Sequence, residues 1–207
     1  LNEISLISLL DNLWNTPLTS LDLNLSFCRG ISDLTLFVLS QFRLITNLES
    51  LSLNFNDCKS ITDKGILDLF QGISQLLKLR SLTICFNYCV KITDESLSLF
   101  NEMLSSLSQI ENLSLSFDFC TLLTDTAVRR LSRWIDKFKN IKELVLSFSS
   151  CKLTEMSLSF LEYTLLKKKS IEYVFLKIPC KGISRDDVQS FKRKFKGIRC
   201  VVVQSPC

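Results

Sequence analysis

The sequence contains no histidine, and its 207 residues include only five glycines and three prolines. Without histidine the chain cannot build a Ser-His or Cys-His nucleophile pair, and no metal site can use an imidazole ligand. The glycines are scattered, so they form neither a Gly-x-Gly-x-x-Gly fingerprint nor a Walker-type phosphate loop. We therefore expect no enzyme active site, no bound metal and no cofactor.

Long apolar stretches are also missing. No run approaches the roughly 18 uninterrupted apolar residues that a membrane-spanning helix needs. The N-terminus lacks the basic segment followed by an apolar one that marks a signal peptide. Hydrophobic residues nevertheless make up 46% of the chain, which is too many for a disordered protein. The sequence therefore predicts a folded chain without a membrane span.

Charge is divided unevenly along the chain. Residues 1–128 contain 7 basic and 14 acidic residues, whereas residues 129–207 contain 18 basic and 7 acidic ones. The overall charge of +4 thus hides an acidic N-terminal part and a basic C-terminal part. An acidic partner would be attracted to the basic part.

A repeat of about 30 residues runs through the sequence. In one unit Leu48, Leu51 and Leu53 form the pattern L-x-x-L-x-L, which recurs at intervals of 27 to 31 residues. A cysteine follows the start of every unit by nine or ten positions: Cys28, Cys58, Cys89, Cys120, Cys151, Cys180 and Cys207. We expect residues 1–17 to be the helix of a preceding or capping repeat. About six and a half repeats then occupy 18–47, 48–78, 79–109, 110–140, 141–170, 171–197 and 198–207.

Each unit is predicted to contain one strand and one helix. The segment "LSLNF" at 51–55 alternates apolar and polar residues, which is the period of a half-buried strand. The segment "ITD" at 61–63 suits a helix start, because Thr62 is a good N-cap and Asp63 complements the positive end of the helix dipole. A strand and helix of this length cannot bury their apolar faces alone, so the units must stack on one another.

This pattern of leucines, cysteine and Ile-Thr-Asp resembles the cysteine-containing leucine-rich repeats, best known from the F-box-type substrate receptors of ubiquitin ligases. The resemblance covers 18–207. The sequence departs from the family in two ways: its strand is longer, and its repeats are similar in length to the long repeats of ciliates and other protists. It implies an α/β fold, a right-handed solenoid with a parallel sheet on the concave side and helices on the convex side. It also implies that the chain binds another protein and performs no chemistry.

The seven cysteines of the repeat column could form a metal ladder, a disulfide ladder or part of the core. Because they recur once per repeat at the same angular position, they line up along the solenoid and do not converge as zinc ligands do. Parallel side chains also give poor disulfide geometry. We interpret these cysteines as small buried residues in a reducing compartment, such as the cytoplasm, with a cilium or the cytoskeleton as further settings. Cys85 and Cys200 fall outside the column, at predicted outward strand positions, and are the expected exposed thiols.

The outward strand residues are not committed to the core and form the candidate binding surface. In the first four repeats they are short and polar, as at Ser50, Ser52 and Asn54. From the fifth repeat their character changes, and the candidate partner-binding residues are Glu143, Val145, Tyr173, Phe175, Lys177, Val202 and Gln204. Exposed aromatic residues grouped among polar ones are typical of an interaction hot spot. The alternative is that another segment of the same protein covers these rows.

Basic residues cluster on the predicted helices of the C-terminal part: Arg129, Arg130, Arg133, Lys167, Lys168, Lys169, Lys192, Arg193, Lys194 and Lys196. They form either a solvated convex face or a docking site for an acidic partner, such as an acidic protein tail, nucleic acid or an anionic membrane. Nucleic acid is the less expected partner, because no base-stacking aromatic motif interleaves the charges. Phe191 and Phe195 are predicted to face inward.

The sequence therefore predicts a non-catalytic protein-interaction or assembly module that binds another protein, which could be acidic, on the concave face of its C-terminal repeats. Two alternatives stay open: the substrate-recognition part of an F-box-type ubiquitin ligase, and a structural subunit of a large ciliary or organellar complex. The first and last repeats lack polar caps, which favours a piece of a longer protein or a subunit of a larger assembly. No small-molecule substrate is expected.

Overall fold

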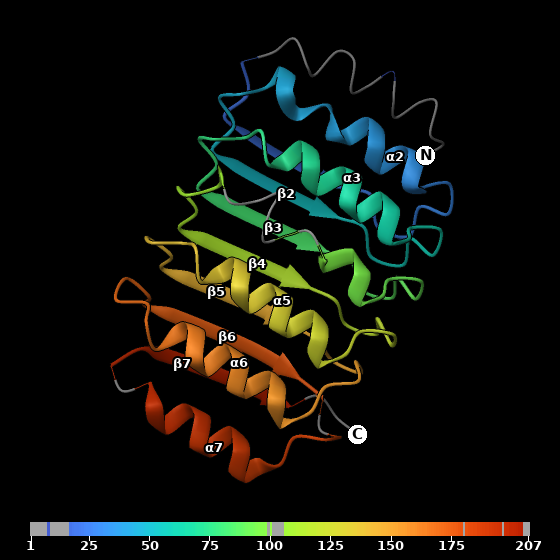
Figure 1. The fold of residues 1–207 in the computed structure, drawn as a ribbon. Helices are drawn as coiled ribbons and strands as arrows, with labels where there is room; N and C mark the ends of the chain where they lie inside the picture. The colour runs from blue at the N-terminus through green and yellow to red at the C-terminus, as the bar shows by residue number, and fades with distance from the viewer. Residues whose placement is uncertain are drawn as a thin grey trace.

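The strands of the chain form one parallel sheet in sequence order (Figure 1). The computed structural model describes Ser8, residues 17–98, Phe100, and residues 106–179, 181–195 and 197–204. Within these residues the strands are β1 (Ser20–Asn24), β2 (Ser50–Asn54), β3 (Ser81–Cys85), β4 (Asn112–Ser116), β5 (Glu143–Ser147), β6 (Tyr173–Ile178) and β7 (Arg199–Gln204). Each strand pairs with the next one along the chain, as a stack of repeats requires.

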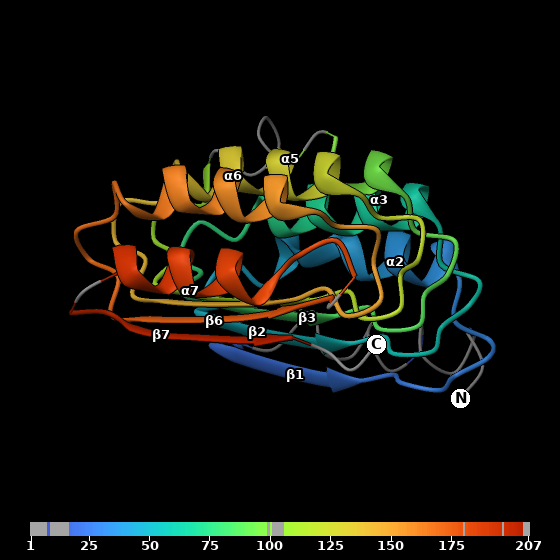
Figure 2. The ribbon, with the colours of Figure 1, turned by 90° about the horizontal axis from the view of Figure 1, so that it is seen from below.

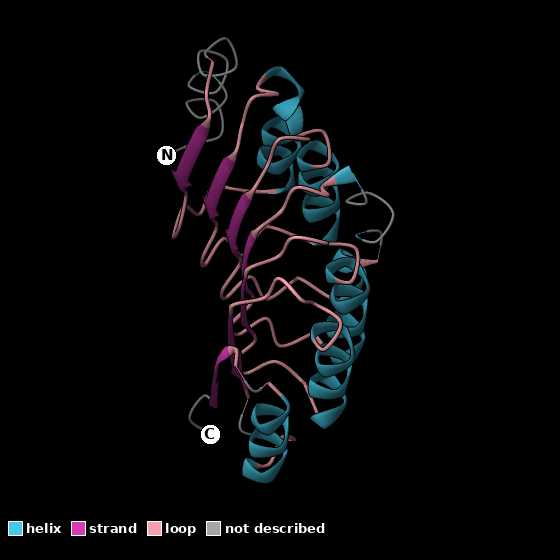
Figure 3. Cartoon of the chain, turned by 90° about the vertical axis from the view of Figure 1, so that its left-hand side faces the viewer, coloured by secondary structure: helices cyan, strands magenta, loops and turns pink. Residues whose placement is uncertain are grey.

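The helices cover one face of this sheet and leave the other bare (Figure 2). They are α2 (Asp33–Leu39), α3 (Asp63–Ile73), α5 (Asp125–Ile135), α6 (Glu155–Leu165) and α7 (Arg185–Lys194), with 3₁₀ turns η1 (Ser40–Leu44) and η2 (Asp94–Leu97). The sheet bows toward the helices, so its bare face is concave (Figure 3). The predicted α/β solenoid, with a parallel sheet on the concave side and helices on the convex side, is thereby confirmed. No helix among the described residues is long and apolar enough to span a bilayer.

Two predicted helical segments fall mostly beyond the described part of the chain. The expected capping helix at 1–17 contributes only Ser8 and the final residue, Pro17, to the described residues. In the third repeat the structure describes η2 and Phe100, whereas 101–105 lie outside.

Apolar side chains at every second strand position form the core. In β2, Leu51 and Leu53 point inward and are buried, and Phe55 extends the row beyond the strand. The equivalent rings stack from repeat to repeat, with centroid distances of 5.3 Å (Phe55–Phe86), 5.8 Å (Phe86–Phe117) and 5.6 Å (Phe117–Phe148). Each buried ring contributes roughly 2 kcal/mol of hydrophobic stabilisation. Contact between successive rings sets the spacing of the repeats.

The starts of α2, α3, η2 and α5 are each linked to the following repeat by a carboxylate. The Thr62 side chain caps α3 by accepting a hydrogen bond from the Lys64 N–H at 3.3 Å. The N–H and hydroxyl of Thr62 also donate to the Asp33 carboxylate of the preceding repeat, at 2.8 and 2.6 Å. The same pairing joins Asp63 to Thr93, Asp94 to Thr124 and Asp125 to Thr154. The aspartate of the repeat motif, expected beside a helix dipole, therefore also ties neighbouring repeats together.

Four of the column cysteines are buried hydrogen-bond donors. Cys58, Cys89, Cys120 and Cys151 donate from Sγ to a main-chain carbonyl of the preceding repeat, at 3.3, 3.2, 3.1 and 3.2 Å. Burial raises the pKa of Cys58 to about 11 and that of Cys151 to about 12, and it raises the pKa of Cys89 and Cys120 as well. These four thiols are therefore protonated at neutral pH and unsuited to nucleophilic attack. Cys28 is half-buried, whereas Cys180 and Cys207 lie outside the described residues.

Candidate functional site

The bare face of the sheet presents three rows of outward side chains, set by the strand register. From β1 to β7 the first row is Ser20, Ser50, Ser81, Asn112, Glu143, Tyr173 and Arg199. The second is Asp22, Ser52, Thr83, Ser114, Val145, Phe175 and Val201, and the third is Asn24, Asn54, Cys85, Ser116, Ser147, Lys177 and Val203. Short polar side chains line the first four strands, and larger apolar ones appear on the last three.

Val145, Phe175 and Val201 lie side by side on β5, β6 and β7, and we call these residues the C-terminal patch. All three are half-buried, although they face away from the core. Beside them, the Arg199 guanidinium lies 5.4 Å from the centre of the Tyr173 ring, which is the geometry of a cation–π contact. The patch thus combines an apolar centre with an aromatic and charged margin.

The structure corrects the predicted placement of Val202, Gln204 and Cys200. Val174 pairs with Cys200 and Leu176 with Val202, so the sixth repeat, predicted at 171–197, is one residue shorter than the sequence pattern indicated. Val202 is buried, and the Gln204 amide donates to the Ile183 carbonyl at 2.7 Å. Cys200 also packs partly against the core. Because a shift of one residue exchanges the two faces of a strand, the outward positions on β7 are Arg199, Val201 and Val203.

Cys85 does lie on the concave face, in the middle of the third row, and it is half-buried. Burial raises the pKa of its thiol, and the Asp118 carboxylate raises it further. The thiol is thus more accessible than the four buried column cysteines but is not activated toward nucleophilic attack.

Lys177 is committed to an internal ion pair. Its ammonium lies 2.7 Å from the Asp118 carboxylate, which is buried at the end of β4. The other oxygen of Asp118 accepts from the Ser147 hydroxyl at 2.6 Å and from the Ser149 N–H at 2.7 Å. Lys177 therefore neutralises a buried charge two strands away, and its role toward a partner is secondary to this one.

The predicted basic cluster separates into paired and unpaired residues. Arg130 contacts Glu95 (3.1 Å), Lys194 contacts Glu162 (2.6 Å), and Lys167 lies 3.8 Å both from Asp136 and from the centre of the Tyr163 ring. Among the described residues, by contrast, no ion pair or hydrogen bond is formed by the side chains of Arg129, Arg133, Lys169, Lys192 and Arg193. Lys196 lies outside the described residues.

Lys168 serves the fold. Its ammonium donates to the main-chain carbonyls of Asp136 and Phe138 at 2.5 and 2.9 Å, just beyond the C-terminal end of α5. Its side chain is 7% exposed, and the resulting desolvation lowers the pKa of the ammonium. It cannot dock a partner without breaking these bonds. Phe191 and Phe195 are both buried, as their spacing predicted.

Sequence reasoning missed a row of exposed aromatic residues at the strand ends. Phe27, Tyr88 and Phe119 each precede a column cysteine, adopt positive φ angles near 60°, and are 73%, 45% and 37% exposed. The rings of Tyr88 and Phe119 stack on each other with centroids 4.3 Å apart. A left-handed conformation is unusual for bulky side chains. Their position directly before each cysteine was the available signal, but only the loop conformation shows that they are exposed.

No group of three or more Cys, Asp or Glu side chains that could hold a metal ion occurs among the described residues. The aspartates at the starts of α2, α3, η2 and α5 accept hydrogen bonds from the next repeat, and the four buried column thiols donate to carbonyls. Both sets of groups are thus engaged within the fold.

No protein-family model matches the sequence, and no curated protein matches it either. Among solved structures, the fold is similar to a chain in the crystal structure of the Rad7 and Elc1 complex in yeast, with a TM-score of 0.60 and 20% sequence identity. The alignment covers 98% of this chain and 53% of that chain, so this chain spans about half the length of its structural neighbour. At this level of identity the likeness concerns the fold alone.

Proposed function

We propose that this chain is a non-catalytic module that binds another protein through the concave face of its last three strands. The single observation that carries the proposal is the C-terminal patch, where Val145, Phe175 and Val201 replace the small polar side chains of the same row in β1 to β4. Apolar side chains grouped on an otherwise polar surface are typical of interaction sites.

Phe175 is the proposed anchor of the interface. It lies at the centre of the patch, between Val145 and Val201, and it is held by hydrogen-bonded strands on both sides. Because the sheet is already ordered, a partner would bind it without a large loss of backbone entropy. Tyr173 and Arg199 supply a polar and aromatic rim, whereas Glu143 carries a negative charge at the edge of the patch.

Two observations support a more specific proposal, namely that the bound protein is a substrate of a ubiquitin ligase. The repeat motif resembles that of F-box-type substrate receptors, and the fold is similar to a chain of a two-protein complex, that of Rad7 and Elc1. Identification of ubiquitin-ligase subunits by mass spectrometry, in complexes purified with this chain from its native cells, tests this proposal. A partner set without any ligase subunit contradicts it but leaves protein binding itself in place.

The main test places a photo-crosslinking amino acid at position 175 and, as a matched control, at position 83. Thr83 occupies the same row on β3, three strands away, so both positions face solvent from the same sheet. We expect a partner from an extract of the source cells to crosslink at position 175 and not at position 83. The Phe175→Asp variant should lose this partner, whereas Thr83→Asp should keep it. Equal crosslinking at the two positions would exclude the C-terminal patch as the binding site.

A further inference from the structure

A groove runs between α5 and α6 on the convex side, opposite the sheet. It has a volume of about 220 Å³, and its lining includes Arg129, Ser132, Arg133, Asp136, Phe160 and Tyr163. A second hollow of about 220 Å³ shares Arg129 and Phe160 with the first and extends to Met156. The two hollows therefore form one continuous depression along the helix pair.

The α5 wall of the groove carries two unpaired guanidinium groups. Arg129 and Arg133 are four residues apart and so lie on one face of the helix. Both are exposed, and neither forms an ion pair or hydrogen bond within the described residues. Arg130, on the neighbouring face, is instead paired with Glu95. The groove thus holds cations whose binding capacity the fold leaves unused.

The floor of the groove contains an unsatisfied hydroxyl. Ser132 is 4% exposed, and its Oγ has no hydrogen-bond partner within the described part of the chain. Buried polar groups normally have a hydrogen-bond partner, because burying a polar group without a hydrogen bond costs free energy. A ligand oxygen in the groove would supply the missing partner, since a serine hydroxyl can donate one hydrogen bond.

The α6 wall is apolar and aromatic. Phe160 is half-buried in the groove, Tyr163 is 69% exposed, and Met156 at the far end is 49% exposed. The Lys167 ammonium covers the Tyr163 ring, at 3.8 Å from its centre. Two acidic groups line the combined depression. The Asp136 carboxylate lies 3.8 Å from the ammonium groups of both Lys167 and Lys168, and the Asp125 carboxylate accepts hydrogen bonds from Thr154 of the next repeat. The groove is therefore cationic on one side and apolar on the other.

We propose that this groove binds an acidic peptide segment of a partner protein, in which carboxylates flank an apolar side chain. The carboxylates would pair with Arg129 and Arg133, one of them also accepting from the Ser132 hydroxyl, while the apolar side chain packs against Phe160 and Tyr163. Arginine suits this role because its planar guanidinium binds a carboxylate through two parallel hydrogen bonds. Two guanidinium groups one helical turn apart, about 5.4 Å, match two separate carboxylates better than a single doubly charged phosphate.

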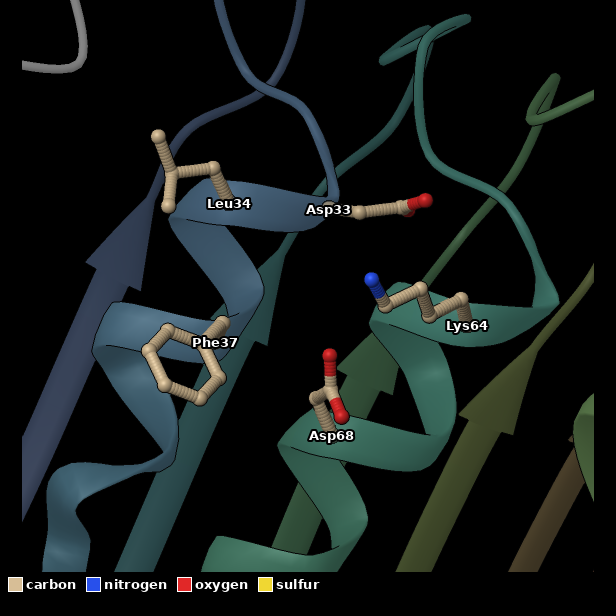
Figure 4. A pocket seen from close by; sticks show the side chains of 5 residues that line it. All are labelled: Asp33, Leu34, Phe37, Lys64 and Asp68. Atoms are coloured by element: carbon tan, nitrogen blue, oxygen red, sulfur yellow. The ribbon is translucent and has the colours of Figure 1, made fainter.

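The corresponding groove between α2 and α3 lacks the arginine pair and provides an internal comparison. There Leu34 and Phe37 of α2 line one side and Lys64 and Asp68 of α3 line the other, with Asp33 at the same opening (Figure 4). Asp68 stands where α6 has Phe160, counting from the start of each helix. Its carboxylate would repel an acidic segment, so we expect selective binding at the α5–α6 groove.

The test uses the full chain and a fluorescein-labelled peptide, Glu-Asp-Phe-Glu-Asp, with Gln-Asn-Phe-Gln-Asn as the uncharged control. Fluorescence polarisation should show saturable binding of the acidic peptide only. Replacing Arg129 or Arg133 with Gln should weaken binding by about tenfold each, because each loses a charge-assisted pair. Arg193→Gln removes an exposed, unpaired cation on α7 and serves as the matched control, with no change expected. Hydrogen exchange should show peptide-dependent protection confined to α5 and α6.

Ser132→Ala separates a binding role from a structural one. Because the hydroxyl has no partner in the free protein, its removal should leave the unfolding midpoint unchanged or raise it, while peptide affinity falls about threefold. Several results would overturn the proposal: no saturable binding, an equal loss in Arg193→Gln, or protection that maps to α2 and α3. A phosphorylated peptide that binds at least tenfold more tightly would overturn it in favour of a phosphate site. Loss of binding to phosphatidylserine vesicles in the arginine variants, without peptide binding, would identify a membrane surface instead.

Discussion

Removal of a single carboxylate from the chain of helix starts should weaken the stack of repeats. The Asp63 carboxylate accepts hydrogen bonds from the N–H and hydroxyl of Thr93, at 2.7 and 2.5 Å, across the boundary between two repeats. Hydrogen bonds to a charged group contribute about 1.5–3 kcal/mol each when buried. Because both residues are partly exposed, water replaces part of this energy. We therefore expect Asp63→Ala to lower the free energy of unfolding by about 2 kcal/mol.

Two further variants separate this link from the general effect of an acidic residue in the helix. Asp63→Asn keeps an oxygen that can accept from the Thr93 N–H but loses the charge, so about half of the destabilisation is expected. Asp68→Ala removes a carboxylate from the same helix that makes no hydrogen bond or ion pair within the described residues, and it should change stability by less than about 0.5 kcal/mol.

Urea denaturation followed by circular dichroism measures all three variants against the unmodified chain. The expected order of stability loss is Asp63→Ala, then Asp63→Asn, then Asp68→Ala. Equal losses for Asp63→Ala and Asp68→Ala would show that the Asp63 carboxylate contributes no more than an unpaired carboxylate in the interior of the same helix. In that case the inter-repeat link would contribute nothing measurable.

Three other outcomes follow from the packing and from the thiols. Gly72→Ala should destabilise the fold by about 3 kcal/mol in a thermal melt, because an added Cβ would lie 2.1 Å from a main-chain oxygen at the end of α2. Gly197 has open space around it, so Gly197→Ala should cost only about 1 kcal/mol, which comes from its positive φ angle. Stability should fall as pH rises above about 8.5, since the folded-state pKa values of about 11 for Cys58 and 12 for Cys151 exceed the unfolded one. A Cys58→Ala, Cys151→Ala variant with the same pH dependence of its urea midpoint would contradict this assignment. With a thiol reagent at neutral pH, the half-buried Cys85 should react before either of these two, and simultaneous labelling would contradict the burial order.

The repeat period made most of the fold predictable from sequence. A strand and a helix that recur every 27 to 31 residues bury their apolar faces only by stacking. The cysteine column then marks the end of each strand, and the Thr-Asp pair marks each helix start. The sequence could not show that Asp33 and Thr62 bond to each other across 29 residues, because that contact depends on how neighbouring repeats are aligned in space.

In the last repeat, the alternation of apolar residues does not determine which face of the strand is buried. In "RCVVVQ" at 199–204 apolar residues occupy both alternating phases, so periodicity alone does not distinguish the inward from the outward face. The repeat pattern predicts Val201 and Val203 as inward residues, which places Val202 on the outward face. That prediction is wrong, because Val202 is buried. The register with β6 settles the matter, because Val202 pairs beside the inward Leu176. The patch retained Val145 and Phe175, and it gained Val201.

The C-terminal patch and the α5–α6 groove lie on opposite faces of the same repeats, so their occupants should bind independently. Phe175 faces outward from the sheet, whereas Arg133 lies on the helix layer, and the buried core separates them. A variant carrying Phe175→Asp should therefore lose the concave partner and keep its affinity for the acidic peptide. Arg133→Gln should do the reverse, and the effects of the two changes should add when they are combined. If either change altered both binding events, a single partner wrapping around the edge of the solenoid would account for both surfaces better than two separate sites.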